Sequence, residues 1–251
     1  PTVLDEQGAP VIQCVLAGTS EETWADSDRG LGARDLAMNI ALPEVDGRVL
    51  AGAVAFKSAA TWDATCEVDV VTHRPLQANV DFACALAVRW SRLRRTPAAE
   101  RRIAMLLANY PNRDGRIANG VGLDTPAGAI AALTAMRQAG YRVDDLPGDG
   151  NALVEHLLAG PTNAGLAGRE IRESLSLEDY RAFFDTLPQA LRQAVTERWG
   201  PPEDDPFHVV GTGFALPFAR FGNIAVGIQP ARGYNIDPKE SYHAPDLPPP
   251  H

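Results

Sequence analysis

Three continuous apolar runs mark the first half of the chain, at residues 11–17, 49–56 and 103–108. The first is rich in β-branched residues, and the second follows an Asp46-Gly47 turn signal. Strands buried on both faces of a parallel sheet show this pattern, because neither face presents polar residues to water. We therefore predict that the three runs are neighbouring central strands of a mainly parallel sheet.

The segment 76–93 carries apolar residues at spacings of three and four, which indicates an amphipathic helix. Thr125 before Pro126 and Ser176 before an acidic turn are expected N-caps, and Gly140 is an expected helix end. The predicted helices are 76–93, 125–139, 151–158, one that begins after Ser176 and one from 188 to 199, with short helical patterns at 21–26 and 33–40. Further strands are expected at 141–146, 209–210 and 224–228.

Alternating strands and helices predict an α/β fold with three layers, α/β/α, around a mainly parallel sheet. A helical insertion and an irregular, proline-rich C-terminal segment complete it. The chain is expected to be one internal region of a larger subunit, with lobes at 1–147 (the α/β sheet core) and 148–251 (the helical insertion and the returning strands).

Composition narrows the class of protein. With 45% hydrophobic and 22% charged residues, the chain is neither collagen, coiled coil nor generally disordered. Its formal charge of −9 argues against nucleic acid as a partner. The sequence contains no run of about 18 apolar residues, so it predicts no membrane span. The 3 cysteines are widely spaced and contain no CxxC pair, so we expect a reducing, cytoplasmic setting.

Arginine is the expected anion-binding residue, since only Lys57 and Lys239 are lysines. The loop 109–122 follows a predicted strand and carries Asn109, Arg113, Arg116 and Asn119 among its glycines. Such a loop can bring backbone N–H groups and guanidinium groups to an anion. The alternative is that these residues only build tight turns. The chain has no Walker loop or GxGxxG fingerprint, so ATP hydrolysis by this chain is not expected.

Carboxylates and histidines offer weaker signals. Glu44 and Asp46 lie two residues apart before the second strand, where Asp-Gly is first of all a turn signal. His243 and His251 lie in the proline-rich tail without metal-binding spacing, so solvated side chains are the alternative to transient metal ligands. Four arginines lie near the end of the predicted helix 76–93: Arg89, Arg92, Arg94 and Arg95. They are expected to complement the helix dipole, and binding of a ligand is the alternative.

Four longer motifs add what spacing does not. They are LPEVDG, NYPNRDGRIANGVGLDTPAG, FGNIAVGIQPARGY and DPKESYHAPDLPPPH. In this order they resemble the large-subunit family of aerobic cobaltochelatase (CobN) and, more distantly, that of magnesium chelatase. The resemblance covers nearly the whole chain. Since the family's chains are several-fold longer, it also implies an internal fragment, which by itself should be inactive.

The resemblance implies a ligase-type metal chelatase of cobalamin biosynthesis. The large subunit would bind a corrinoid tetrapyrrole, hydrogenobyrinic acid a,c-diamide, and insert Co²⁺ as a substrate, while AAA+ chelatase subunits hydrolyse ATP. Glu44 and Asp46 are then candidate catalytic carboxylates, and His243 and His251 candidate metal ligands. The candidate substrate-binding residues in matching motifs are Asn109, Arg113, Arg116, Asn119 and Arg232.

Alternatives remain open at this point: a docking or scaffold module of the same subunit, a magnesium-chelatase-like region acting on protoporphyrin, or a free-standing nucleotide- or sugar-binding domain. If the chelatase hypothesis holds, the fold should bring distant motifs together. We expect Glu44, the loop 113–122 and the segment 232–251 to converge on one cleft at the carboxyl edge of the sheet.

Overall fold

The computed structural model describes residues 8–109, 114–118, 120, 122–233, 244 and 246–251, with the side chain of Arg116 left undescribed. The chain forms two compact units, Pro1–Thr96 (unit 1) and Pro97–His251 (unit 2). Each unit is described by itself below. The expected α/β class is confirmed.

The sheet of unit 1 is built on a parallel pair. β1 (Ile12–Leu16) runs parallel to β2 (Val49–Lys57), and β5 (His73–Pro75) runs antiparallel to β2 on its other side. Both predicted strands are therefore confirmed. A small core that includes Val15 and Phe56, each 1% exposed, lies against this sheet.

A crossover joins β1 to β2, as parallel strands require. It consists of α1 (Glu21–Ala25), α2 (Ala33–Asp35), the π-helical stretch η1 (Leu36–Ala41) and α3 (Leu42–Val45). The Asp46-Gly47 turn then leads into β2, and Gly47 adopts a φ of 77°, a left-handed conformation that favours glycine. The crossover starts at the carboxyl end of β1 and ends at the amino end of β2.

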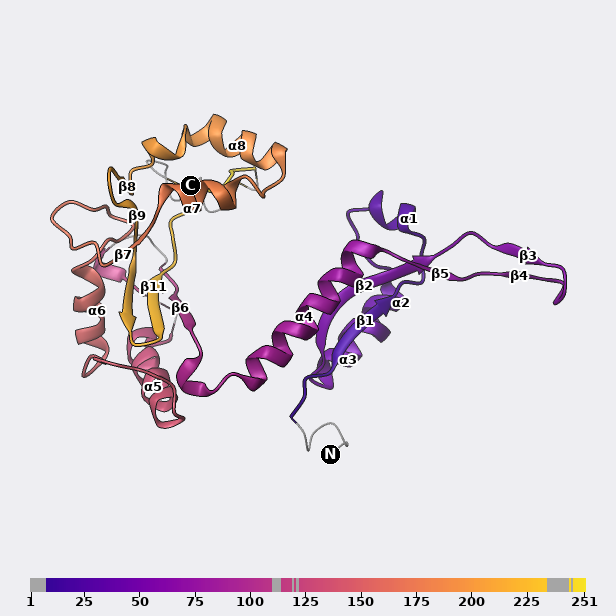
Figure 1. Cartoon of the computed structure of the whole chain (residues 1–251), viewed down its shortest axis with the longest axis horizontal. Coiled ribbons are helices and arrows are strands. Elements are labelled where there is room, and N and C mark those ends of the chain that lie inside the picture. The colour runs from indigo at the N-terminus through magenta and orange to yellow at the C-terminus, as the bar shows by residue number, and fades with distance from the viewer. Residues whose placement is uncertain (1–7, 110–113, 119, 121, 234–243, 245) are drawn as a thin grey trace. The chain divides into compact units, whose positions relative to one another are not determined.

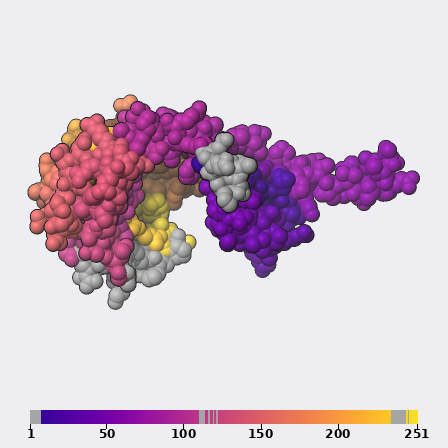
Figure 2. All heavy atoms as spheres, turned by 90° about the horizontal axis from the view of Figure 1, so that it is seen from below, coloured from indigo at the N-terminus to yellow at the C-terminus, as the bar shows by residue number. Residues whose placement is uncertain are grey.

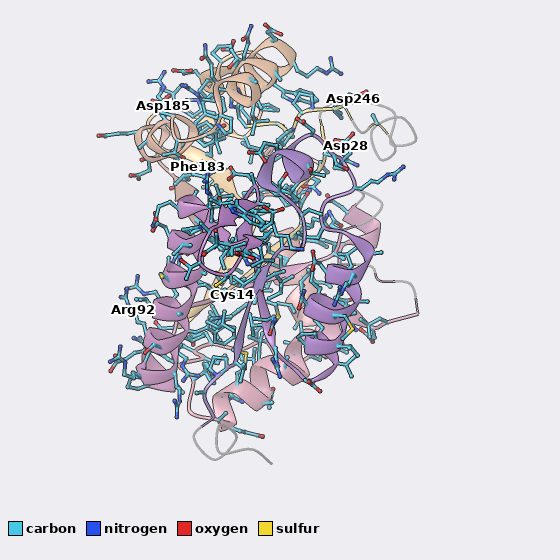
Figure 3. The ribbon with its side chains drawn as sticks, turned by 90° about the vertical axis from the view of Figure 1, so that its right-hand side faces the viewer. Cys14, Asp28, Arg92, Phe183, Asp185 and Asp246 are labelled. Atoms are coloured by element: carbon cyan, nitrogen blue, oxygen red, sulfur yellow. The ribbon has the colours of Figure 1, made fainter. Side chains whose placement is uncertain are left out.

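A narrow hairpin and a long helix complete unit 1. β3 (Thr61–Asp63) and β4 (Val68–Val70), not predicted from the sequence, pair antiparallel in an arm that extends from the sheet (Figures 1 and 2). α4 (Gln77–Arg95) confirms the helix predicted at 76–93 and packs on β2. Its last turn carries Arg92, Arg94 and Arg95, and Arg92 points away from the ribbon (Figure 3). This placement fits the dipole interpretation of these arginines.

Unit 2 contains a second parallel pair. β6 (Ile103–Leu107) runs parallel to β11 (Ile224–Ile228), which also pairs antiparallel with β10 (Phe218–Phe221). The prediction that β6 neighbours β1 and β2 in one sheet is therefore wrong, and the three-layer arrangement around one mainly parallel sheet is not confirmed. The described strands form four small sheets. The expected burial on both faces is also not found in β6, since Leu106 is 59% exposed while Leu107 is 4% exposed. An apolar run locates a strand, but not which strand it pairs with.

The main core of unit 2 joins this sheet to two helices, α5 (Thr125–Gln138) and α6 (Gly150–Leu158). Leu133, Leu153 and Ile224 are fully buried in it. Since this core includes residues from Leu107 to Ile228, a lobe boundary at 147/148 would cut through it. The boundary lies instead between Thr96 and Pro97.

Local signals at these helix ends predict the structure correctly with one exception, and one predicted strand is absent. Gly140 has the expected positive φ of 87°, and the Ser176 hydroxyl caps its helix through a 3.0 Å bond from the Asp179 N–H. The N-cap of α5, however, is Asp124 rather than Thr125, because the Asp124 carboxylate accepts from the Ala127 N–H at 3.0 Å. The segment 141–146 forms no strand.

Two predicted helices are confirmed in the helical insertion. They lie beside a third sheet (Figure 1). α7 (Leu177–Phe184) and α8 (Gln189–Trp199) follow β7 (Glu173–Leu175), whose sheet also holds β9 (Gly213–Leu216) and β8 (His208–Val209). Short 3₁₀ turns complete the fold: η2 (Ala98–Glu100), η3 (Asp114–Arg116) and η4 (Pro202–Asp204). No helix in the described ranges is long and apolar enough to cross a membrane.

Candidate functional site

The carboxyl edge of the β6–β11 pair gathers polar groups from two motifs far apart in the chain. Asn109 follows β6, and Gln229 follows β11, where its N–H donates to the Leu107 carbonyl at 2.9 Å. Asn109 is only 5% exposed, and its Oδ1 has no hydrogen-bond partner among the described residues. Since buried polar atoms are nearly always paired, an oxygen without a partner is a candidate acceptor for a hydrogen bond from a ligand. Open α/β sheets bind ligands at such an edge.

A network around Asp114 fixes the start of η3 (Asp114–Arg116). One carboxylate oxygen of Asp114 accepts from the Thr162 hydroxyl at 2.7 Å, and the other forms an ion pair with Arg169. Arg169 also donates to the carbonyls of Leu158 and Gly160, at 3.0 and 3.2 Å. The segment from Thr162 to Arg169 thereby stabilises this edge of the sheet. Its small, irregular residues carry no sequence pattern that predicts this role.

The predicted substrate-binding residues are partly visible at this edge. Arg113 and Asn119 lie outside the described residues, and only the backbone of Arg116 is described. Arg232 lies four residues after the end of β11, and its Nη2 is 3.5 Å from the Ala244 carbonyl oxygen. Asn109 and Arg232 thus follow the same ends of two paired parallel strands. Their binding role stays a prediction.

A largely apolar pocket of about 400 Å³ adjoins the segment after β11, because Pro230 and Ala231 form part of its wall. Four aromatic rings belong to the rest of the lining: Tyr180, Phe183, Phe207 and Phe214. Phe183 extends from α7 and is labelled in Figure 3. The one acidic residue in the lining is Asp205, which is 5% exposed. Pockets that bind planar apolar ligands combine such walls with a few polar groups.

His251 lies at the wall of this pocket with both ring nitrogens engaged. Its Nδ1 is 2.6 Å from the Tyr180 hydroxyl and its Nε2 is 2.9 Å from the Gly200 carbonyl oxygen. A carbonyl only accepts, so Nε2 carries the hydrogen and Nδ1 of the neutral ring accepts from Tyr180. A metal ion would have to displace one of these bonds, and the predicted metal role of His251 stays a prediction.

Tyr180 provides a pH test of this arrangement. Burial, together with the negative charge of Asp205, raises the pKa of Tyr180 to about 12. As the pH rises above about 10, the unfolded chain loses this proton while the folded chain keeps it, so the free energy of unfolding should fall from about pH 10 to 12. Denaturant unfolding across this range should show the loss, and Tyr180→Phe should remove this component. An identical alkaline slope in Tyr180→Phe would contradict the assignment.

Glu44 and Asp46 lie at the amino end of β2. Glu44 is exposed on α3, and Asp46 forms a 3.8 Å ion pair with Arg48, which also donates to the Gln13 side chain at 3.2 Å. The prediction that Glu44 lies at the carboxyl edge of its sheet is therefore wrong. The crossover helix carries the chain back past the strands before Glu44 is reached. Its catalytic role, and its convergence with the residues of unit 2, stay predictions.

Metal-binding side chains do not cluster within the described ranges. No group of three His, Cys, Asp or Glu side chains that could hold a metal ion is found there. His243, one of the two predicted metal ligands, lies outside these ranges. The three cysteines, Cys14, Cys66 and Cys84, are free and exposed.

Comparison with known proteins decides the family. The family model described as CobN/Magnesium Chelatase matches residues 1–251, the whole chain. The chain belongs to the CobN/magnesium chelatase family. Its membership confirms the resemblance indicated by the four motifs.

Named relatives fall on both branches of the CobN/magnesium chelatase family. The aerobic cobaltochelatase subunit CobN of Sinorhizobium sp. is 61% identical over 251 residues, and that of Pseudomonas aeruginosa is 49% identical over 244 residues. A magnesium-chelatase subunit of Rhodobacter capsulatus is 26% identical over 223 residues, which are 86% of this chain and 18% of that protein. The two CobN alignments cover 100% and 96% of this chain.

A solved structure gives the same result. The catalytic subunit of cobaltochelatase from Mycobacterium tuberculosis superposes with a TM-score of 0.75 at 36% identity, covering 97% of this chain and 20% of that one. The chain likewise spans 20% of the length of both CobN relatives. It therefore corresponds to one region of much longer proteins.

Proposed function

We propose that this chain forms part of the tetrapyrrole-binding subunit of an ATP-dependent cobaltochelatase, which inserts Co²⁺ into hydrogenobyrinic acid a,c-diamide. The observation that carries this proposal is the aromatic pocket, whose wall includes Pro230 and Ala231 just before Arg232. The same unit holds the buried Oδ1 of Asn109, which has no hydrogen-bond partner among the described residues. A tetrapyrrole combines a flat apolar ring with peripheral carboxylates. The aromatic rings suit the former and the arginines suit the latter.

Metal insertion requires a base for the pyrrole protons and ligands that replace water on the arriving ion. Glu44 and Asp46 are proposed as carboxylates of the first kind, and His243 and His251 as ligands of the second. Arg113, Arg116 and Arg232 are proposed to bind the substrate's carboxylates, with Asn109 and Asn119 as amide partners. ATP would be hydrolysed by AAA+ partner subunits in the cytoplasm, since this sequence carries no phosphate loop.

Two other functions require a test. A docking or scaffold region of the same subunit would bind the AAA+ subunits and leave the tetrapyrrole to other regions. A magnesium-chelatase-like region would prefer protoporphyrin. The 26% identity to a magnesium-chelatase subunit is the reason to test this alternative. The 61% and 49% identities to CobN subunits favour the cobalt branch.

Separate titrations of the full-length subunit distinguish these functions. We expect binding of hydrogenobyrinic acid a,c-diamide, weaker binding of protoporphyrin, and no ATP hydrolysis without the AAA+ subunits. Replacing Phe214, which is 5% exposed in the pocket wall, by leucine should weaken tetrapyrrole binding and leave AAA+ binding intact. Tetrapyrrole binding by Phe214→Leu that equals the wild type would remove the pocket from the proposal.

A further inference from the structure

Unit 1 contains a polar pocket of about 460 Å³ that none of the predicted site residues lines. It lies at the carboxyl ends of β1 and β2, the edge at which open α/β sheets bind ligands. Its lining comes from the loop after β1, the start of the crossover helix, and the paired ends of β2 and β5. The site is therefore built from four segments that the sheet brings together.

Two cations line this pocket. Lys57, the last residue of β2, and Arg34, on α2, form no ion pair in the part of the chain that the structure describes. The sequence has only two lysines and a formal charge of −9. An unpaired ammonium and guanidinium in one pocket of so acidic a chain favour an anionic ligand.

A hydroxyl group adds a neutral donor beside Lys57. The Thr19 carbonyl accepts from the Lys57 N–H at 2.9 Å, which holds the two residues side by side. The Thr19 Oγ1 is buried and has no hydrogen-bond partner among the described residues. A buried hydroxyl without a partner costs free energy, so a ligand that accepts from it would recover that cost.

The one carboxylate in the lining of this pocket is already hydrogen-bonded within the protein. Asp35 is 7% exposed, and its two oxygens accept from the Gly18 N–H at 2.8 Å and from the Asn39 amide at 2.9 Å. His73 donates its Nε2–H to the Ala17 carbonyl at 3.2 Å. These bonds fix the loop after β1. With one carboxylate against two cations, the pocket keeps a net positive charge.

We propose that this pocket binds a carboxylate group, with Lys57 and Arg34 as its cations and the Thr19 hydroxyl as its neutral donor. The carboxylate belongs to the periphery of the tetrapyrrole, so this assignment rests on the proposed function. Phosphate is also an oxyanion that these groups could bind, and it is the competing ligand. The arginines that the sequence motifs indicated, Arg113, Arg116 and Arg232, are not among the residues that line this pocket.

The test uses the full-length subunit and two probes, hydrogenobyrinic acid a,c-diamide and its methyl ester, in which the carboxylates are uncharged. Lys57→Gln should weaken binding of the acid about tenfold, as loss of one charge-assisted hydrogen bond does, and leave binding of the ester unchanged. Lys57→Arg should restore most of the affinity. Arg89→Gln removes the same charge from the exposed face of α4 and should change neither affinity.

Thr19→Val separates a binding role from a structural one. It removes the buried unpaired hydroxyl and keeps the shape, so the melting temperature should stay equal or rise, while affinity for the acid falls. Wild-type affinity for the acid in both Lys57→Gln and Thr19→Val would overturn this proposal and leave the proposed function standing.

Two further outcomes would also contradict the assignment of this pocket to a carboxylate. If the wild-type subunit binds neither probe, the proposed function fails, and the assignment of this pocket fails with it. If Lys57→Gln weakens binding of inorganic phosphate and leaves binding of the acid unchanged, the site belongs to phosphate and the carboxylate assignment is wrong.

Discussion

Replacing Asp114 by alanine should lower the free energy of unfolding by about 2–3 kcal/mol, because two partners lose their acceptor at once. The Thr162 hydroxyl is fully buried, and the Arg169 side chain is 19% exposed. Each would be left without the carboxylate that now satisfies it. Denaturant unfolding of the 251-residue chain measures the effect.

The control for Asp114→Ala is Asp185→Ala, which also breaks an aspartate–arginine pair. Asp185 bonds to Arg192 at 3.1 Å, but its side chain is 72% exposed, so its removal should cost less than about 1 kcal/mol. The local consequence is also distinct. Asp114→Ala removes the bonds that hold η3, so on the proposed function it should weaken tetrapyrrole binding, whereas Asp185→Ala should not. Equal losses of stability in the two variants would show that the bonds of Asp114 do not stabilise the carboxyl edge of the β6–β11 pair.

Element type is predictable from the sequence wherever a pattern is local. The apolar runs locate β1, β2 and β6, the helical spacing locates α4, and the residues at its ends locate α5. Pairing between strands is not local: β6 pairs with β11, which lies more than a hundred residues further along the chain. Short strands such as those of the β3–β4 hairpin carry too few residues for a periodic signal, so the sequence does not predict them.

The candidate site shows the same division. A loop between a strand and a helix points to the carboxyl edge of β6, and the structure places Asn109 there. Thr162 and Arg169 join that edge from 48 and 55 residues beyond Asp114, and irregular loops have no spacing that predicts such contacts. The prediction for Glu44 names the wrong edge for a related reason. Turn residues before a strand signal its start, and a strand's start lies at its amino end.

The catalytic hypothesis for Glu44 makes a large prediction. In the full-length subunit, Glu44→Gln should lower the rate of Co²⁺ insertion at saturating tetrapyrrole by about a hundredfold or more, the usual contribution of a general base. Tetrapyrrole affinity should change little, because glutamine keeps the shape and removes only the proton acceptor. Asp81→Asn, a change of the same charge on α4, should leave the rate unchanged.

The opposite result would assign Glu44 to the turn. Its backbone already supports that role, since the Glu44 carbonyl accepts from the Gly47 N–H at 2.9 Å whatever the side chain is. Glutamine preserves this bond, so stability should not change in either case, and the insertion rate alone decides. If the rate of Glu44→Gln equals that of the wild type while Asp205→Asn lowers it, the proton acceptor is the buried carboxylate in the aromatic pocket of unit 2. Because Asp205 accepts from the Phe207 N–H at 2.8 Å, its variant needs a matched melting curve to separate lost chemistry from lost structure.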